Sequence, residues 1–158
     1  MPTKILYDLS KVDFVHPEFN IDAIRSVNPQ RFEFEQLTAV DKHLPDEGII
    51  IGHLDISEDE FWVRGHIPGN PVFPGVLMLE AAAQLCSFFQ LKYVEENRFF
   101  GFAGVNSTKF RGTVLPGDRF IIISKAILLR RRRSTFYCQG VVKNTLVFEA
   151  EISGICLS

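Results

Sequence analysis

The pattern of apolar and polar residues predicts one long helix over residues 76–94. Apolar side chains occur on almost every side of this segment, and a helix of that kind has to be buried on all sides. Elsewhere, runs rich in β-branched and aromatic residues are typical of strands. We expect strands at residues 49–57, 99–105, 119–132, 134–143 and 146–157.

The remaining parts of the chain show weaker patterns of apolar and polar residues. Apolar residues at helical spacing within 19–27 predict a short helix, which Pro29 ends. Residues 32–40 alternate weakly and favour a further strand. Turn-forming and polar residues predict breaks at 44–48, 58–70, 96–98 and 143–145, the last as a hairpin turn.

The alternation within the last strand predicts how the sheet is covered. Odd-numbered residues from 147 to 153 share one face and include two glutamates, whereas even-numbered residues from 148 to 156 are apolar or small. One face is therefore expected to be packed and the other largely exposed to water. One buried helix and five or six strands fit a strongly bent antiparallel sheet wrapped around the helix, an α+β architecture. Residues 1–19 carry no strong period and are interpreted as an N-terminal extension of one domain, residues 20–158.

Composition narrows the class of protein. A chain of 158 residues, 46% of them hydrophobic, suits one globular domain. The net charge of −2 gives no electrostatic reason to expect nucleic-acid binding. Polar residues within 76–94 argue against a membrane span, and the first residues lack the apolar run of a signal peptide. Three widely spaced cysteines, Cys86, Cys138 and Cys156, favour a reducing cytoplasm and give no zinc-binding pattern.

The most informative stretch is GHIPGNPVFPGVLMLEAAAQ, residues 65–84. Its prolines fix backbone φ angles, so the loop is stiff and can hold His66 in one position. Pro74 suits the first turn of a helix, where the N–H groups of Gly75 and Val76 have no helical partners. These groups and the helix dipole favour negative charge, so they can stabilise a carbonyl oxygen that becomes an enolate.

One glutamate, Glu80, lies among the apolar residues of the helix. Burial would raise its pKa and make it an acid near neutral pH, whereas His66 titrates near neutrality by nature. A base, an acid and an oxyanion site fit proton abstraction next to a thioester carbonyl, followed by loss of a β-hydroxyl. Taken separately, each feature also has a plainer explanation: a solvated loop histidine, and a glutamate hydrogen-bonded to Gln84 one turn later.

The same stretch closely resembles the signature of the 3-hydroxyacyl-(acyl carrier protein) dehydratases, a family with the hotdog fold. The match keeps the prolines, the glycines, His66 and Glu80, the last two fourteen residues apart as in the family. Ile67 and Ala82 are apolar replacements for the usual phenylalanine and methionine. Segments at 102–120, 128–133 and 149–152 are also similar, so the resemblance covers about residues 20–157.

The sequence departs from the family pattern at residues 29–39, PQRFEFEQLTA. Gln30 and Glu33 stand where the family typically has a histidine and a second proline, and Thr38-Ala39 replaces an Asp-Arg pair. These departures bear on the acyl-chain preference and on subunit contacts. They do not involve the histidine and glutamate of the signature.

The resemblance implies an active site shared between the two subunits of a homodimer. His66 of one chain would abstract the C2 proton of the substrate, and Glu80 of the other would help the C3 hydroxyl leave as water. A glutamate at this position resembles the family branch that dehydrates, whereas the branch that also isomerises the double bond typically has aspartate. The thioester oxygen would lie at the N–H groups of the helix start, and no metal or organic cofactor would be needed. The residues implied for the oxyanion site are Gly75 and Val76, and those for site support or an acyl tunnel are Pro68, Pro74, Gln84 and Phe102.

An acidic acyl carrier protein is the implied partner, in fatty-acid or lipid A precursor biosynthesis. The basic run Arg130, Arg131, Arg132 and Arg133 would form a docking patch with Lys109 and Arg111, or else be a solvated strand end. Dimers of the family often assemble into hexamers. Two alternative functions stay open: a hotdog thioesterase or enoyl-thioester hydratase, and a non-catalytic module that binds acyl chains or a carrier protein.

Overall fold

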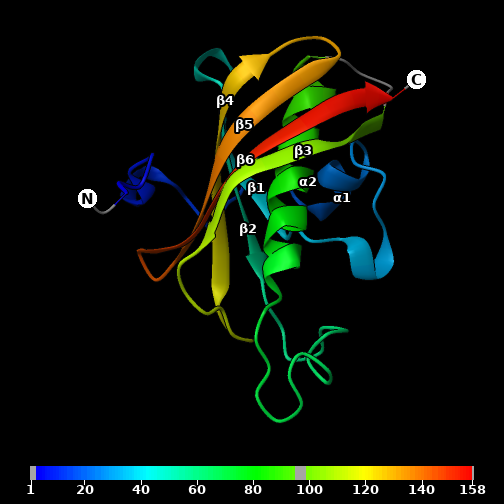
Figure 1. Ribbon diagram of the computed structural model, residues 1–158. Helices are drawn as coiled ribbons and strands as arrows, with labels where there is room; N and C mark the ends of the chain where they lie inside the picture. Colours follow the sequence, from blue (N-terminus) through cyan, green and yellow to red (C-terminus); the bar gives the residue numbers. More distant parts are fainter. Residues whose placement is uncertain (1–2, 95–98, 158) are drawn as a thin grey trace.

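The computed structural model of the protein describes residues 3–94 and 99–157. These residues form one antiparallel sheet of six strands in the order β1-β2-β4-β5-β6-β3 (Figure 1). The break predicted at 96–98 lies outside the described residues. The strands are β1 (Ala39–Leu44), β2 (Ile49–Asp55), β3 (Phe99–Phe110), β4 (Arg119–Leu129), β5 (Arg133–Val142) and β6 (Thr145–Leu157). The helices are α1 (Ile21–Arg25) and α2 (Gly75–Tyr93), with single 3-10 turns at Leu9–Lys11, Phe32–Phe34 and Pro45–Glu47.

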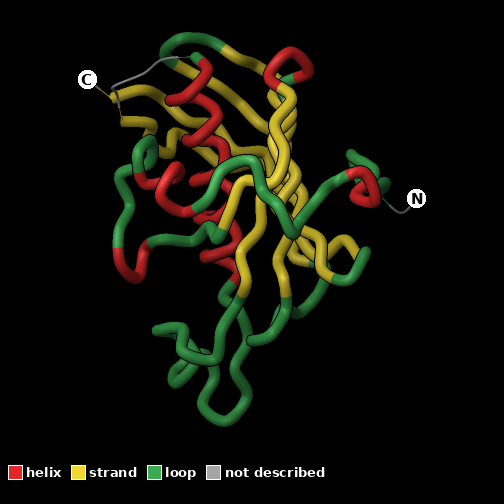
Figure 2. The backbone as a smooth tube through the Cα atoms, turned by 180° about the vertical axis from the view of Figure 1, so that it is seen from behind, coloured by secondary structure: helices red, strands yellow, loops and turns green. Residues whose placement is uncertain are grey.

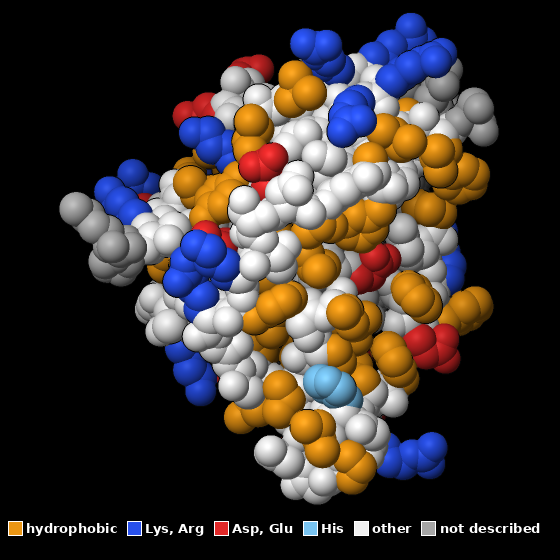
Figure 3. Space-filling model, in the orientation of Figure 1, with side chains coloured by type: hydrophobic (Ala, Val, Ile, Leu, Met, Phe, Trp, Pro, Cys, Tyr) orange, Lys and Arg blue, Asp and Glu red, His pale blue; other side chains and the backbone are white. Residues whose placement is uncertain are grey.

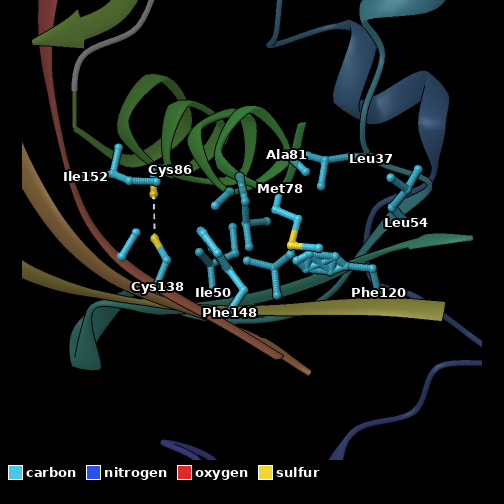
Figure 4. Close-up of a cluster of buried hydrophobic side chains, with 14 of the residues drawn as sticks. Leu37, Ile50, Leu54, Met78, Ala81, Cys86, Phe120, Cys138, Phe148 and Ile152 are labelled. Carbon is cyan, nitrogen blue, oxygen red and sulfur yellow. Dashed lines mark hydrogen bonds between the residues drawn. The ribbon is translucent and has the colours of Figure 1, made fainter. Parts of the chain in front are cut away.

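The sheet curves around α2, which therefore lies against its concave face (Figures 1 and 2). Met78 and Cys86 of the helix pack with Ile50, Phe120 and Phe148 of the sheet in one buried apolar cluster (Figure 4). Burial of the helix by the sheet is what its apolar surface predicted, so the α+β architecture is confirmed. No helix within the described ranges is long and apolar enough to cross a membrane.

The strand predicted at residues 32–40 is wrong over most of its length. Phe32–Phe34 form a 3-10 turn, and β1 begins only at Ala39. The reason is a tertiary hydrogen bond: the backbone N–H of Gln36 donates to the side-chain oxygen of Gln84 on α2, at 3.0 Å. This part of the chain therefore follows the helix instead of joining the sheet.

The arginine run also differs from its predicted strand. β4 ends at Leu129, and Arg130 to Arg132 form the turn to β5. The amide of Gln90, near the end of α2, donates to the carbonyls of Arg130 and Arg131, at 2.9 and 3.3 Å. The buried glutamine thus donates hydrogen bonds to backbone carbonyls of the turn. In a continued strand, the neighbouring strand would supply these hydrogen bonds.

The outer face of the sheet is covered, contrary to the expectation of a largely wet face. Glu149 of β6 is buried and accepts a hydrogen bond from Arg111, at 2.7 Å. Residues 5–14 of the N-terminal extension pack on the outer side of β2, β4 and β5, against Ile51, Ile123 and Val141. Two hydrogen bonds with the Gln139 side chain, one from the Leu6 N–H and one to the Lys4 carbonyl, hold the extension there. Figure 1 shows this segment on the opposite side of the sheet from α2.

A buried pair of titratable residues, a histidine and an aspartate, lies on the same outer face. The Nδ1 atom of His53 on β2 is 2.7 Å from the Asp41 carboxylate on β1, and both side chains are at least 97% buried. His53 Nε2 lies 3.5 Å from Asp55, which accepts two hydrogen bonds from Arg119. The ring of Phe14, from the N-terminal extension, contacts the imidazole edge-on.

Candidate active site

His66 lies in a long loop, residues 56–74, that extends beyond the end of the sheet where α2 begins (Figure 2). Its backbone N–H donates to the Trp62 carbonyl and its carbonyl accepts from the Val72 N–H, both at 2.8 Å. Its Nδ1 lies 2.7 Å from the Val72 carbonyl oxygen. Because a carbonyl oxygen only accepts, Nδ1 carries the hydrogen, and Nε2 of the neutral ring keeps a free lone pair. The loop therefore presents an exposed and oriented base.

The start of α2 has the open N–H groups that the sequence predicted. Pro74 is the N-cap residue, and it provides no side-chain hydrogen bond to the helix. Neither Gly75 nor Val76 donates its N–H to any residue that the structure describes. A Cβ atom on Gly75 would lie 2.9 Å from the ring of Phe110, so glycine permits the close approach of β3 to the helix start.

Glu80 lies one turn further along α2 and is partly buried. Burial raises its pKa above the usual range for a glutamate, although a hydrogen bond from Gln84 Nε2, at 3.0 Å, partly opposes this rise. Gln84 is itself fixed, because it also donates to the Phe34 carbonyl and accepts from the Gln36 N–H. The structure therefore provides a carboxyl group that holds its proton at higher pH than an exposed glutamate does.

A cavity of about 170 Å³ lies beside Glu80, between α2, β3 and β6. The helix residues that line it are spaced three, four and seven positions from Glu80 and so share one face. The cavity brings together Glu80, Gln84 and Phe102 of the residues singled out in the sequence. His66, Pro68, Pro74, Gly75 and Val76 lie on the loop and the helix start and do not line it. The full lining is Gln30, Glu80, Ala83, Gln84, Ser87, Phe100, Gly101, Phe102, Ile152, Ser153 and Gly154.

Eight of the eleven lining residues were missed by the sequence analysis as site residues, and four of them show why. Ser87 could have been found from its position seven residues after Glu80, on the same helix face. Gln30 was noticed only as a departure from the family pattern. Ser153 and Gly154 reach the cavity through the pairing of β6 with β3, which no local pattern indicates.

The residues proposed for docking do not form one patch within a protomer. Lys109 and Arg111 lie at the end of β3, beside the start of α2, as the contact of Phe110 with Gly75 shows. The arginine run Arg130–Arg133, which comprises the turn and the first residue of β5, lies at the other end of α2. A helix of 19 residues is about 28 Å long, so the two groups are far apart in one chain. Arg111 is also paired with Glu149.

The outer edge of β3 is apolar and adjoins the site. β3 is an edge strand of the sheet, and Phe102, Val105 and Phe110 on it are exposed. Ile67 of the loop and Val76 of the helix start are exposed as well. Figure 3 shows hydrophobic side chains gathered along the middle of this face. An edge strand with an exposed apolar surface is typical of a protein–protein interface.

The three cysteines are free thiols, and Cys86 and Cys138 lie in the core with their sulfur atoms 3.5 Å apart. Within residues 3–94 and 99–157, no group of three or more His, Cys, Asp or Glu side chains is arranged to hold a metal ion.

Comparison with solved structures shows the fold. The dehydratase heterocomplex ApeI:P from Xenorhabdus doucetiae superposes with a TM-score of 0.73 at 13% identity, over 85% of this chain and 91% of that one. Cj0977, a sigma28-regulated virulence protein from Campylobacter jejuni, superposes with a TM-score of 0.66 at 15% identity, over 87% and 90%. The fold is the hotdog fold that the family resemblance implied.

Comparison with sequences shows the family. Residues 28–151 match the FabA-like domain. The chain is 32% identical to the 3-hydroxyacyl-(acyl-carrier-protein) dehydratases FabZ of Geobacter metallireducens and Ehrlichia chaffeensis, over 85% of this chain and 91% and 93% of theirs. It is 34% identical to the bifunctional enzyme LpxC/FabZ of Chlorobaculum tepidum over 85% of this chain, and spans 29% of that enzyme's length. The chain therefore belongs to the FabA-like family, among its FabZ-type 3-hydroxyacyl-(acyl-carrier-protein) dehydratases.

Proposed function

We propose that the protein removes water from a (3R)-3-hydroxyacyl chain on acyl carrier protein and releases the trans-2-enoyl form, with His66 as base and Glu80 as acid. The FabZ relatives are named for this dehydration. The observation that carries the proposal is the pair of complementary groups: an imidazole with a free Nε2 and a carboxyl group whose pKa is raised by burial. The reaction serves fatty-acid or lipid A precursor biosynthesis in the cytoplasm, where the free buried thiols stay reduced.

The proposed steps balance without a cofactor. Nε2 of His66 takes the C2 proton, and the electron pair moves onto the thioester oxygen, which the N–H groups of Gly75 and Val76 stabilise as an enolate. Glu80 then gives its proton to the C3 hydroxyl. The C3–O bond breaks, water leaves, and the electron pair forms the C2–C3 double bond. The proton returns from His66 to Glu80 through solvent before the next turnover.

We propose that the active site is shared between two subunits; the absence of His66 from the lining of its own Glu80 cavity supports this arrangement. The Phe110 end of β3 lies beside the loop that holds His66, since the Phe73 N–H donates to the Val114 carbonyl. The Phe100 to Phe102 end lines the Glu80 cavity. A twofold axis through the middle of β3 pairs these two ends antiparallel, edge to edge. Each His66 then comes beside the Glu80 cavity of the partner subunit.

The same symmetry joins the two basic groups. It brings Lys109 and Arg111 of one subunit towards the arginine run, Arg130–Arg133, of the other. We propose this composite surface as the docking patch for an acidic carrier protein. Assembly of three such dimers into a hexamer stays a prediction.

The function is tested with purified protein and a 3-hydroxyacyl chain on acyl carrier protein, followed by intact-mass spectrometry. We expect loss of one water from the carrier-bound chain. Release of free acid would instead identify a thioesterase, and reaction only with coenzyme A thioesters an enoyl-thioester hydratase. A substrate that binds but is unchanged would identify a non-catalytic module.

The pH dependence of the reaction tests the role of Glu80. Glu80 has to be protonated to act as an acid, so kcat/KM falls as the pH rises through the pKa of Glu80. The Gln84 hydrogen bond lowers this pKa, so Gln84→Met is expected to move the alkaline limb of the pH profile to higher pH. Gln90→Met is the matched control, because Gln90 is a buried glutamine of the same helix without contact to Glu80. An alkaline limb that stays in place in Gln84→Met contradicts the assignment of Glu80 as acid.

A further inference from the structure

Within residues 57–72, the loop around His66 has one buried side chain, that of Trp62. Trp62 is 5% exposed and belongs to the core, whereas residues 64–70, which include His66, are all exposed. A segment with so few buried apolar contacts moves unless it is fixed at some point. Trp62 is therefore the anchor on which the position of this part of the loop depends.

Hydrogen bonds join the anchor directly to His66. The Trp62 carbonyl accepts from the N–H groups of both Gly65 and His66, at 3.1 and 2.8 Å. On the other side of the loop, the Val72 carbonyl oxygen lies 2.7 Å from the imidazole Nδ1, and the Val72 N–H donates to the His66 carbonyl at 2.8 Å. Backbone groups at positions 62 and 72 therefore hold the base from two sides.

An aromatic contact fixes these two positions relative to each other. The Trp62 ring lies 5.6 Å from the ring of Phe73, which directly follows position 72 and is 2% exposed. The Phe73 ring in turn contacts Phe120 of β4 edge-on, with the ring centres 5.7 Å apart. Both ends of the segment 62–73 are thus fixed in the core, and His66 lies between them.

We infer that Trp62 is a positioning residue for the reaction, which it serves through His66; the inference rests on the proposed function of His66 as the base. The contact of the Trp62 ring with Phe73 keeps the Val72 carbonyl at Nδ1, so the hydrogen stays on Nδ1 and the lone pair on Nε2. Without this contact the carbonyl and the imidazole separate, and the ring populates both neutral tautomers. A base that is displaced by about 1 Å, or is in the wrong tautomer, takes the C2 proton much more slowly.

Trp62→Leu tests the inference in the full chain. We expect kcat for dehydration to fall by about a hundredfold with little change in KM, because the base is misplaced while substrate binding is kept. Nitrogen NMR of isotopically labelled protein at alkaline pH measures the tautomer of His66, whose signals are assigned by their absence in His66→Ala. These signals should change from one tautomer to a mixture of two.

Two variants separate positioning from general destabilisation. Trp62→Phe should keep the single tautomer and most of kcat, since it retains an aromatic ring and Nε1 of Trp62 has no hydrogen-bond partner among the described residues. Phe89→Leu is the matched control, because Phe89 is a fully buried aromatic residue of α2 that contacts Tyr93 and Phe136 and does not line the Glu80 cavity. Phe89→Leu should leave both the tautomer and kcat unchanged.

A folded Trp62→Leu protein that keeps a single tautomer overturns the inference, and so does an equal loss of kcat in Phe89→Leu. If Trp62→Leu does not fold, Phe73→Leu removes the same ring contact, and the fluorescence of Trp62, the single tryptophan of the sequence, reports on it. A red-shifted emission together with a tautomer mixture then supports the inference, and a single tautomer refutes it. Failure of the proposed function is distinguished by the absence of water loss in the unmodified protein, and the tautomer of His66 still decides whether Trp62 positions this side chain.

Discussion

His66→Ala and Glu80→Gln are each expected to lower kcat for dehydration by about a thousandfold, in the range typical of losing a general base or acid. His66→Ala removes the Nε2 lone pair, and Glu80→Gln keeps the shape of the side chain but has no proton to give at neutral pH. The measurement is the rate of enoyl formation under saturating substrate. Matched controls are His16→Ala and Glu47→Gln, which change an exposed histidine and an exposed glutamate far from the cavity.

Mixing the two inactive variants tests whether the site is shared. In a heterodimer of His66→Ala with Glu80→Gln, one site carries both substitutions and the other carries neither. After dissociation and random reassociation of equal amounts, half of the dimers are mixed, so about a quarter of the original activity returns. If each site were built within one chain, every site would keep one substitution and no activity would return. Absence of recovery, with mixed dimers shown by mass spectrometry, would falsify the shared site.

His53→Ala is expected to destabilise the fold by about 1–3 kcal/mol, because it leaves the buried Asp41 carboxyl group without its hydrogen-bond partner. The Asp41 carboxylate would then lose its hydrogen bond with the imidazole, and Oδ1 of Asp41 already lacks a hydrogen-bond partner among the described residues. Burial raises the pKa of Asp41, so this position disfavours an unpaired charge. The measurement is urea unfolding at neutral pH, followed by circular dichroism.

Two further variants separate loss of the pair from loss of packing. Asp41→Asn with His53→Ala removes the buried charge, so the double variant should be less unstable than the sum of the single changes. His16→Ala breaks an exposed contact with Asp13 and should leave the urea midpoint nearly unchanged. If His53→Ala unfolds at the same urea concentration as the unmodified protein, the Asp41 carboxyl group does not need the hydrogen bond with the imidazole.

Patterns within single segments predicted much of the structure. The helix expected at 76–94 begins and ends within one residue of α2, because its apolar surface is set by the segment alone. The hairpin turn expected at 143–145 is also present, with Lys143 and Asn144 at positive φ. His66 and Glu80 were recognisable since the stiff loop and the helix start are continuous in sequence.

The remaining features depend on contacts between distant segments. The strand expected at 32–40 fails because the Gln36 backbone bonds a side chain 48 residues away. The covered outer face of the sheet depends on the N-terminal extension, whose apolar residues have no regular spacing. The cavity combines Gln30, Ser87 and Ser153 from three separate parts of the chain, and only the folded topology places them together.

The attachment of the N-terminal extension has a consequence for the order of folding. The hydrogen bonds of Lys4 and Leu6 with Gln139 join residues 135 and 133 positions apart. During synthesis the extension leaves the ribosome first, yet its binding surface is complete only when β5 has been made and paired. Closing so large a loop costs entropy, so the extension docks late, onto a sheet that already exists. Docking of the extension would therefore be the last step of folding. In a refolding experiment, the fluorescence of a probe placed on this segment should change after all other signals.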